Sequence, residues 1–161
     1  MSDTEQTALE RSTVHSSFVV ERRYPASPQR VFDAWAEQDM KAQWFGPPEK
    51  PEGSYELDFQ VGGREHLSIA MPDGDGYTYD AIYQDIVPGQ RILYTYEMHR
   101  GDRRISVSLA AAEIEADGDG AKLRLTEHGI YLDGQDTPEI REHGTNELVD
   151  KIGAVLLAGE V

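Results

Sequence analysis

Residues 55–71, YELDFQVGGREHLSIAM, contain two stretches of strict alternation on either side of a glycine pair. Every second residue of the first stretch is apolar: Tyr55, Leu57, Phe59 and Val61. This period of two is typical of a strand with one buried face. The pair Gly62-Gly63 predicts a tight turn, after which apolar residues alternate again at Leu67, Ile69 and Met71. The stretch therefore predicts an antiparallel hairpin.

The same alternation continues downstream. Strands are expected at 77–87, 92–98 and 105–109 and around Leu123 and Leu125, separated by the turn sequences PDGDG, Pro88-Gly89, Arg100–Asp102 and ADGDG. Consecutive strands joined by short turns pair antiparallel. With the first hairpin, they predict six consecutive antiparallel strands.

Helical patterns flank these strands. Residues 14–24 are predicted to form one more strand. Ser27-Pro28 predicts the start of a helix, because serine is a favoured N-cap residue and proline is favoured in the first turn. A second short helix is expected over 39–44, capped by Asp39 and ended by Gly46-Pro47-Pro48. A helix of about 20 residues is expected from Thr137-Pro138, with one apolar face: Leu148, Ile152, Val155 and Leu156.

The resulting order is one strand, two short helices, six strands and one long helix. Segregated strands and helices indicate the α+β class. The long helix needs an apolar partner, and the predicted fold is a curved antiparallel β-sheet wrapped around it. We expect residues 14–161 to form a single domain and residues 1–13 to be a flexible lead-in.

Composition limits the function classes. The chain of 161 residues has no cysteine and a net charge of −15, so disulfides are excluded and nucleic-acid binding is not expected. No run of about 18 apolar residues predicts a membrane span, and residues 1–13 resemble no secretory signal, so a cytoplasmic location is expected. An open sheet has edge strands through which a homodimer could form.

Several segments of the sequence resemble the START/Bet v 1-like helix-grip superfamily, in the branch named for the Activator of Hsp90 ATPase homologue. They are PASPQRVFDAWAEQDMKAQWFGP, the glycine pair 62–63, AIYQDIVPGQRILYTYE, LRLTEHG and EHGTNELVDKIGAVL. The resemblance implies a helix-grip fold that binds apolar or amphipathic small molecules. It also implies two alternatives: a cyclase or dehydratase acting on polyketide-like substrates, and a chaperone cofactor. Relatives often carry Gly-Trp where this chain has Gly144-Thr145, which suggests more room at that end of a pocket.

Candidate site residues follow from the predicted faces. On the long helix, Arg141, Gly144 and Thr145 precede the apolar half on the same side, as at a pocket mouth. Alternatively, Arg141 reaches solvent or pairs with a surface acid. Glu65 shares the inner strand face, where a carboxylate needs a partner, either Arg141 or a ligand. Alternatively, Glu65 reaches water beside the glycine turn. The cavity wall is predicted to include aromatic residues that suit an amphipathic ligand: Phe59, Tyr79, Tyr83, Tyr94 and Tyr96.

Two further expectations concern aromatic and titratable residues. Trp44 is expected over the pocket entrance and Phe45 in the core, although both could be core. Glu127 alternates with Leu123 and Leu125 and can point inward. The five histidines are scattered, no metal or cofactor is expected, and no motif of a known catalytic machinery is present. An enzyme here would use Glu65 or a tyrosine as its acid or base, and an ion pair at Glu65 would argue against Glu65 in that role.

Overall fold

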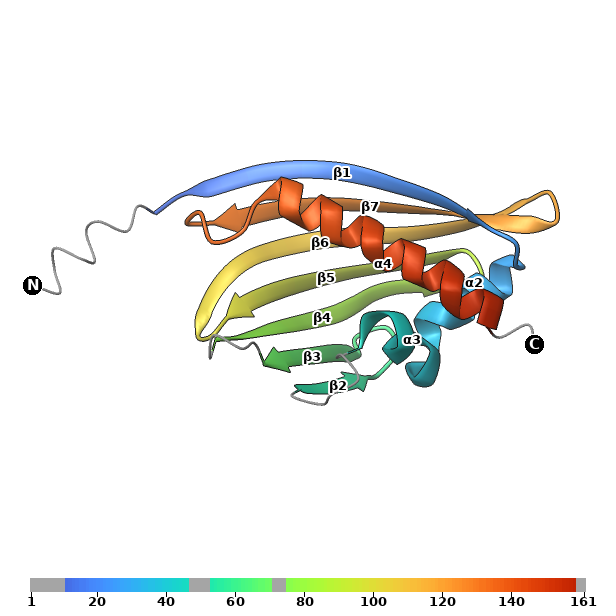
Figure 1. Ribbon diagram of the computed structural model, residues 1–161, viewed down its shortest axis with the longest axis horizontal. Helices are drawn as coiled ribbons and strands as arrows, with labels where there is room; N and C mark the ends of the chain where they lie inside the picture. The colour runs from blue at the N-terminus through green and yellow to red at the C-terminus, as the bar shows by residue number, and fades with distance from the viewer. Residues whose placement is uncertain (1–10, 47–52, 71–74, 159–161) are drawn as a thin grey trace, which may run out of the picture.

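The computed structural model describes residues 11–46, 53–70 and 75–158. One seven-stranded antiparallel sheet has the order β1-β7-β6-β5-β4-β3-β2. Three helices lie on its concave side, with the long C-terminal helix running obliquely across the strands (Figure 1). The structure confirms the helix-grip α+β fold and the predicted element order.

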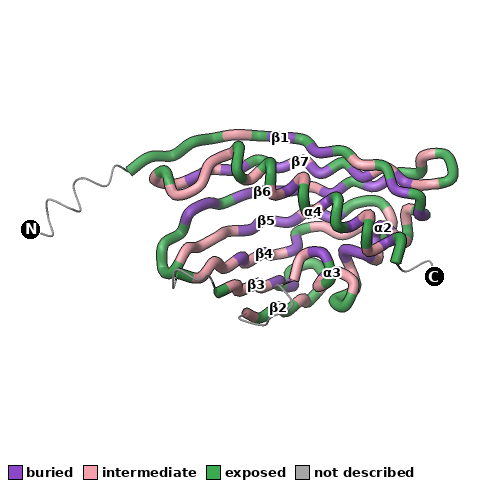
Figure 2. Tube along the Cα trace, viewed as in Figure 1, coloured by how far each residue is buried: buried purple, intermediate pink, exposed green. Residues whose placement is uncertain are grey.

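The strands follow the predicted alternation closely. β2 to β7 each pair with their neighbours in the sequence, whereas β1, which the two short helices separate from β2, pairs with β7. Their bounds are β1 Thr13–Tyr24, β2 Gly53–Leu57, β3 Arg64–Ala70, β4 Gly76–Val87, β5 Arg91–Arg100, β6 Arg103–Asp117 and β7 Gly120–Leu132. The alternation places one face of these strands in the core, seen as buried positions recurring along the central strands (Figure 2).

The first hairpin differs from the prediction. β2 ends at Leu57 and not at Val61, and residues 58–63 form a compact connection held by bonds such as Gly63 N to Gln60 O at 2.7 Å. Gly62 has φ +84°, and a side chain at Gly63 would lie 2.1 Å from the Asp58 carbonyl oxygen. The glycine pair therefore does make the turn, but the turn extends into the residues whose alternation predicted a strand.

The three helices are α2 Pro28–Ala36, α3 Gln38–Phe45 and α4 Pro138–Ala158. The predicted caps of α2 and α4 are present: Ser27 Oγ accepts from Arg30 N at 3.2 Å and Thr137 Oγ1 accepts from Ile140 N at 3.1 Å. The predicted cap of α3 is wrong. Glu37 precedes α3, and Asp39 lies within its first turn, where its charge favours the positive end of the helix.

The buried face of α4 is centred one residue later than predicted. Its fully buried residues are Thr145, Val149, Ile152 and Leu156, whereas Leu148 and Val155 are only partly buried. Both sets have helical spacing, so periodicity alone could not choose between them. Contact with β1 decides which face of α4 is buried, because the Tyr24 hydroxyl donates to the Val149 carbonyl at 2.7 Å.

Some expectations lie outside the described residues. These are Met71, the first part of the PDGDG turn, Pro47, Pro48 and residues 1–10 of the predicted lead-in. Within the described chain, no helix is both long and apolar enough to span a membrane.

Candidate functional site

A cavity of about 640 Å³ lies between α4, α3 and the concave face of the sheet. Its wall is mainly aromatic and aliphatic, with contributions from α2, α3, β3, β4, β5, β6, β7 and α4. Charged side chains reach the wall at a few places, among them Lys41, Glu127 and Arg141. This combination of apolar surface and few polar groups is typical of small-molecule sites.

Most of the predicted site residues lie on this cavity. The lining includes Trp44, Tyr79, Tyr94, Tyr96, Arg141, Gly144 and Thr145. The other three, Phe59, Glu65 and Tyr83, pack behind the wall. Phe59 lies in the 58–63 connection, where its ring contacts Phe32 at 5.6 Å and Tyr83 at 4.9 Å, so it is a packing residue.

Of the two aromatic residues that end α3, Trp44 and not Phe45 is the fully buried one. Trp44 is 4% exposed, donates from Nε1 to the Ala34 carbonyl at 2.8 Å and packs on Trp35 at 4.9 Å. Phe45 is only partly buried and meets the Tyr79 ring at 4.7 Å. Trp44 therefore belongs to the core wall of the cavity and does not cover its entrance.

Glu65 is buried, but its partner is Lys41 and not Arg141. Lys41 Nζ lies 2.9 Å from Glu65 Oε2 and donates to Oε1 at 3.1 Å. Glu65 also accepts from the Tyr55 hydroxyl at 2.5 Å and from the Tyr83 hydroxyl at 2.8 Å. Because its charge is fully paired behind the cavity wall, Glu65 is poorly placed to act as a base on a cavity ligand.

Lys41 was not singled out from the sequence, yet it lies at the centre of an aromatic cage. Its Nζ is 4.7 Å from the ring centre of Phe45, 5.0 Å from Trp35 and 5.3 Å from Trp44. Burial lowers the pKa of Lys41, while the Glu65 carboxylate opposes that shift. Ring faces and carboxylate together stabilise an ammonium group removed from water.

A second polar cluster, formed by Arg141, Tyr96, Glu127, Ser106 and Asp136, lies where α4 begins over β5, β6 and β7. Arg141 donates to the Tyr96 hydroxyl at 2.9 Å and to Ser106 Oγ at 2.8 Å, and it pairs with Asp136 at 2.5 Å. The Tyr96 hydroxyl in turn donates to Glu127 Oε1 at 2.5 Å. Arg141 thus points into the fold, with a side chain 10% exposed, and does not extend into solvent.

Burial controls ionisation in this second cluster. It raises the pKa of Glu127, against the opposing effects of the Tyr96 hydrogen bond and the Arg141 charge. Burial also raises the pKa of Tyr96 well above its ordinary value, with a further contribution from the Glu127 charge. The cavity therefore contains a carboxyl group that gains a proton more readily than an exposed one.

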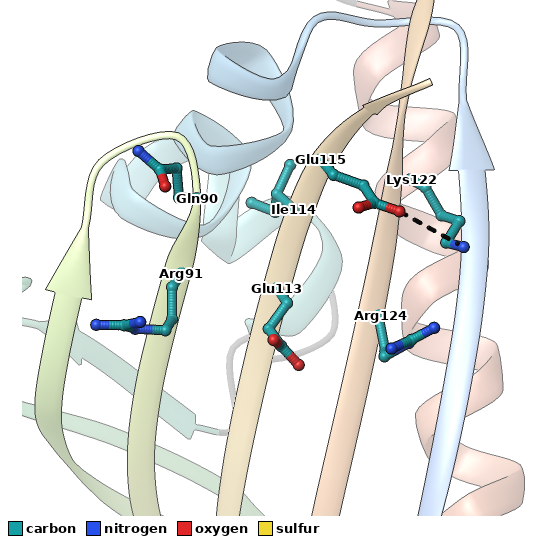
Figure 3. Close-up of a pocket in the computed structure, with 7 residues that line it drawn as sticks. All are labelled: Gln90, Arg91, Glu113, Ile114, Glu115, Lys122 and Arg124. Atoms are coloured by element: carbon teal, nitrogen blue, oxygen red, sulfur yellow. Dashed lines mark ion pairs between the residues drawn. The ribbon is translucent and has the colours of Figure 1, made fainter. Parts of the chain in front are cut away.

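A smaller hollow of about 230 Å³ lies on the opposite face of the sheet. Figure 3 shows Arg91, Glu113 and Arg124 side by side on β5, β6 and β7, turned away from the helices. The cations have carboxylate partners on the surface, as in the Arg124–Glu21 pair at 2.8 Å and the Lys122–Glu115 pair at 3.6 Å. Cross-strand ion pairing explains this hollow without a ligand.

The histidines do not converge. His66 pairs with Asp80 at 2.6 Å on the surface, and His143 has a side chain 79% exposed. Over the described ranges, no three His, Asp or Glu side chains form a group that could hold a metal ion.

Comparison with known proteins agrees with this fold. Two solved structures align over nearly their whole length. An uncharacterized protein from Rhizobium leguminosarum has 40% identity and a TM-score of 0.86, covering 92% of this chain and 99% of that one. The Mll3558 protein from Rhizobium loti has 39% identity and a TM-score of 0.84, covering 89% and 99%.

A protein from Chromobacterium violaceum, CV1439, has the same fold at 23% identity, with a TM-score of 0.71 over 87% of this chain and 96% of that one. The curated proteins contain no match. The model of the Activator of Hsp90 ATPase homolog 1-like protein family matches residues 25–157. The chain therefore belongs to the Activator of Hsp90 ATPase homolog 1-like family.

Proposed function

We propose that the protein binds an apolar or amphipathic small molecule in the cavity beneath α4. The observation that carries the proposal is the cavity itself, whose volume of about 640 Å³ lies within the range of small-molecule sites. Aromatic rings such as Tyr79 and Tyr94 supply apolar area, and two polar clusters supply orientation.

The start of α4 supports the proposal because it leaves space open. A Cβ atom added at Gly144 would meet no atom within 4 Å, although Gly144 lines the cavity. Thr145 turns its hydroxyl back to the Arg141 carbonyl at 2.8 Å. The small residues at 144 and 145 therefore widen the cavity at this end.

The test is binding of N-phenyl-1-naphthylamine, a neutral apolar dye that fluoresces in apolar sites. We expect saturable binding by the unmodified protein and a loss of at least about tenfold in affinity for Gly144→Trp, which fills the cavity. Leu157→Trp is the matched control, because Leu157 is on α4, is 55% exposed and does not line the cavity. Absence of saturable dye binding, or equal loss in both variants, would contradict the proposal.

A second candidate function is acid–base catalysis on a polyketide-like substrate. The observation that favours it is Glu127, a cavity-lining carboxyl group with a raised pKa. It takes the place that the sequence assigned to Glu65, which is committed to Lys41. A panel of β-hydroxy ketones and linear poly-β-ketones, followed by mass spectrometry, tests it: product should form with the unmodified protein and not with Glu127→Gln. The chaperone-cofactor alternative rests on the family description alone.

A further inference from the structure

Arg141 is held rigidly and still has hydrogen atoms to donate. Its guanidinium lies 5.5 Å from the Tyr96 ring centre and 5.3 Å from the Tyr131 ring centre, between the two rings. Its NH2 group donates to Ser106 and Asp136, and its NH1 group donates to Tyr96. Across the described ranges, Nε and the second NH1 hydrogen have no acceptor. Because Ser106 and Asp136 take both NH2 hydrogens, Arg141 cannot bind a further group as a bidentate fork, but Nε or NH1 can still donate one hydrogen bond to an anionic acceptor.

Glu127 adds a further group to the same wall. Its Oε1 accepts from Tyr96, and its Oε2 has no hydrogen-bond partner in the described part of the chain. The titratable groups around it are Tyr94 and Tyr96 from β5, Tyr131 from its own strand, Arg141 from α4 and Asp136 from the preceding loop. The strands on either side of β7 place Phe18 and Ala110 opposite Glu127, and neither side chain can titrate.

Basic residues outnumber acidic residues along the cavity lining, whereas acidic residues outnumber basic ones in the chain as a whole. The chain has 15 lysines and arginines against 30 aspartates and glutamates. The cavity lining instead has four basic residues, Lys41, Arg100, Arg141 and Lys151, against the two acidic residues Glu127 and Asp136. Lys41 is paired with Glu65 behind the wall and Arg100 lies 3.5 Å from Asp75, so the unused hydrogen-bond donors of Arg141 are what favours a ligand with an anionic acceptor group.

We propose that this wall binds the carboxylate of an amphipathic ligand, with one oxygen accepting from Arg141 and the other accepting from protonated Glu127. This inference rests on the proposed function, because it names the chemical class that the same cavity takes. The apolar body of the ligand would lie along Tyr79, Tyr94 and Trp44. Asp136 keeps its place on the NH2 group of Arg141 and does not compete.

A consequence for pH follows from the geometry. Two carboxyl groups can share a hydrogen bond only when one of them carries a proton. In the proposed arrangement Glu127 is the donor, in line with the burial that raises its pKa. Binding should therefore take up a proton and weaken as pH rises through the pKa of Glu127, by up to about tenfold per pH unit above it.

The test uses 3-(2-naphthyl)propanoate and its primary amide as matched probes, titrated at pH 6 and pH 8. We expect the carboxylate to bind at least about tenfold more tightly than the amide at pH 6, and only the carboxylate to weaken at pH 8. Arg141→Met should remove most of the preference for the carboxylate. Glu127→Gln should remove the pH dependence, because the glutamine amide can donate at every pH.

Matched controls come from the outer face of the sheet. Arg91→Met and Glu113→Gln change the same residue types away from the cavity lined by Arg141 and Glu127, and should leave binding of both probes unchanged. If Arg141→Met does not fold, judged by circular dichroism, Arg141→Lys retains the charge but not the planar guanidinium and its hydrogen bonds to Tyr96, Ser106 and Asp136. Arg141→Lys should also reduce the preference for the carboxylate.

The possible negative results distinguish carboxylate recognition, the role of Glu127 and the proposed function from one another. Equal binding of carboxylate and amide, unaffected by a change at Arg141, would overturn carboxylate recognition while leaving small-molecule binding intact. A pH dependence that persists in Glu127→Gln would overturn the role of Glu127. If neither probe binds and N-phenyl-1-naphthylamine also fails to bind, the proposed function itself is wrong.

Discussion

The buried ion pair between Lys41 and Glu65 should make a large contribution to stability. The two side chains are 2% and 0% exposed, so water cannot replace a lost partner. Lys41→Met would leave the Glu65 charge with only the hydroxyl donors of Tyr55 and Tyr83. Removing one partner of a buried pair costs about 3–5 kcal/mol. We expect Lys41→Met to lower the free energy of unfolding by that amount and Tm by about 6–20 °C for a chain of this size.

The double variant separates the pair from its surroundings. Glu65→Gln alone leaves the Lys41 ammonium with the Tyr83 hydroxyl at 3.5 Å and the ring faces, and should also cost about 3–5 kcal/mol. In Lys41→Met/Glu65→Gln no charge is left unpaired. The double variant should therefore be more stable, by about 2 kcal/mol or more, than the sum of the two single changes implies.

The assay is urea unfolding followed by tryptophan fluorescence. Both tryptophans lie against the Lys41 ammonium, with Trp35 and Trp44 4.9 Å apart, so their emission reports directly on this region. Arg124→Met is the control, since the Arg124–Glu21 pair is exposed and should change the free energy of unfolding far less than either buried change. Single changes at Lys41 and Glu65 that each cost less than about 1 kcal/mol, with an additive double variant, would refute the reasoning.

Three further predictions concern stability. Ser27→Ala removes the cap of α2 and should lower the free energy of unfolding by about 1 kcal/mol in urea; an unchanged value would show that the Ser27–Arg30 hydrogen bond contributes nothing. Gly129→Ala places a methyl group about 3.1 Å from the Tyr131 hydroxyl and from Ser108 Oγ, and should cost about 1–3 kcal/mol by overpacking; a stabilised variant in the same assay would contradict this. Burial raises the pKa of Tyr79, Tyr94 and Tyr96 well above 10.0, so the unfolded chain loses these protons first and stability should fall as pH rises past 10. At pH 11 the three together should cost about 4 kcal/mol, measured by urea unfolding at pH 9 and pH 11, and equal stability at both values would rule it out.

Local sequence was a good guide wherever one interaction decides the structure. The alternation in 77–87 and 92–98 predicted β4 and β5, and Ser27-Pro28 predicted the start of α2, because strand period and helix capping act over a few residues. The same reasoning placed Tyr79, Tyr94 and Tyr96 on the inner face, where the structure brings them to the cavity. The strand prediction was wrong over residues 58–61, because the alternation of apolar residues continues there into a turn.

The sequence by itself determined the order of elements and the buried face of the central strands, and it left open whether Glu65 has a buried partner or reaches water. Tertiary structure alone decided that this partner is Lys41, and that Arg141 instead meets Tyr96, Ser106 and Asp136. The physical reason is that the pairing of charged side chains depends on distances between elements remote along the chain. Curvature of the sheet and the tilt of α4 set those distances, and no local period encodes them.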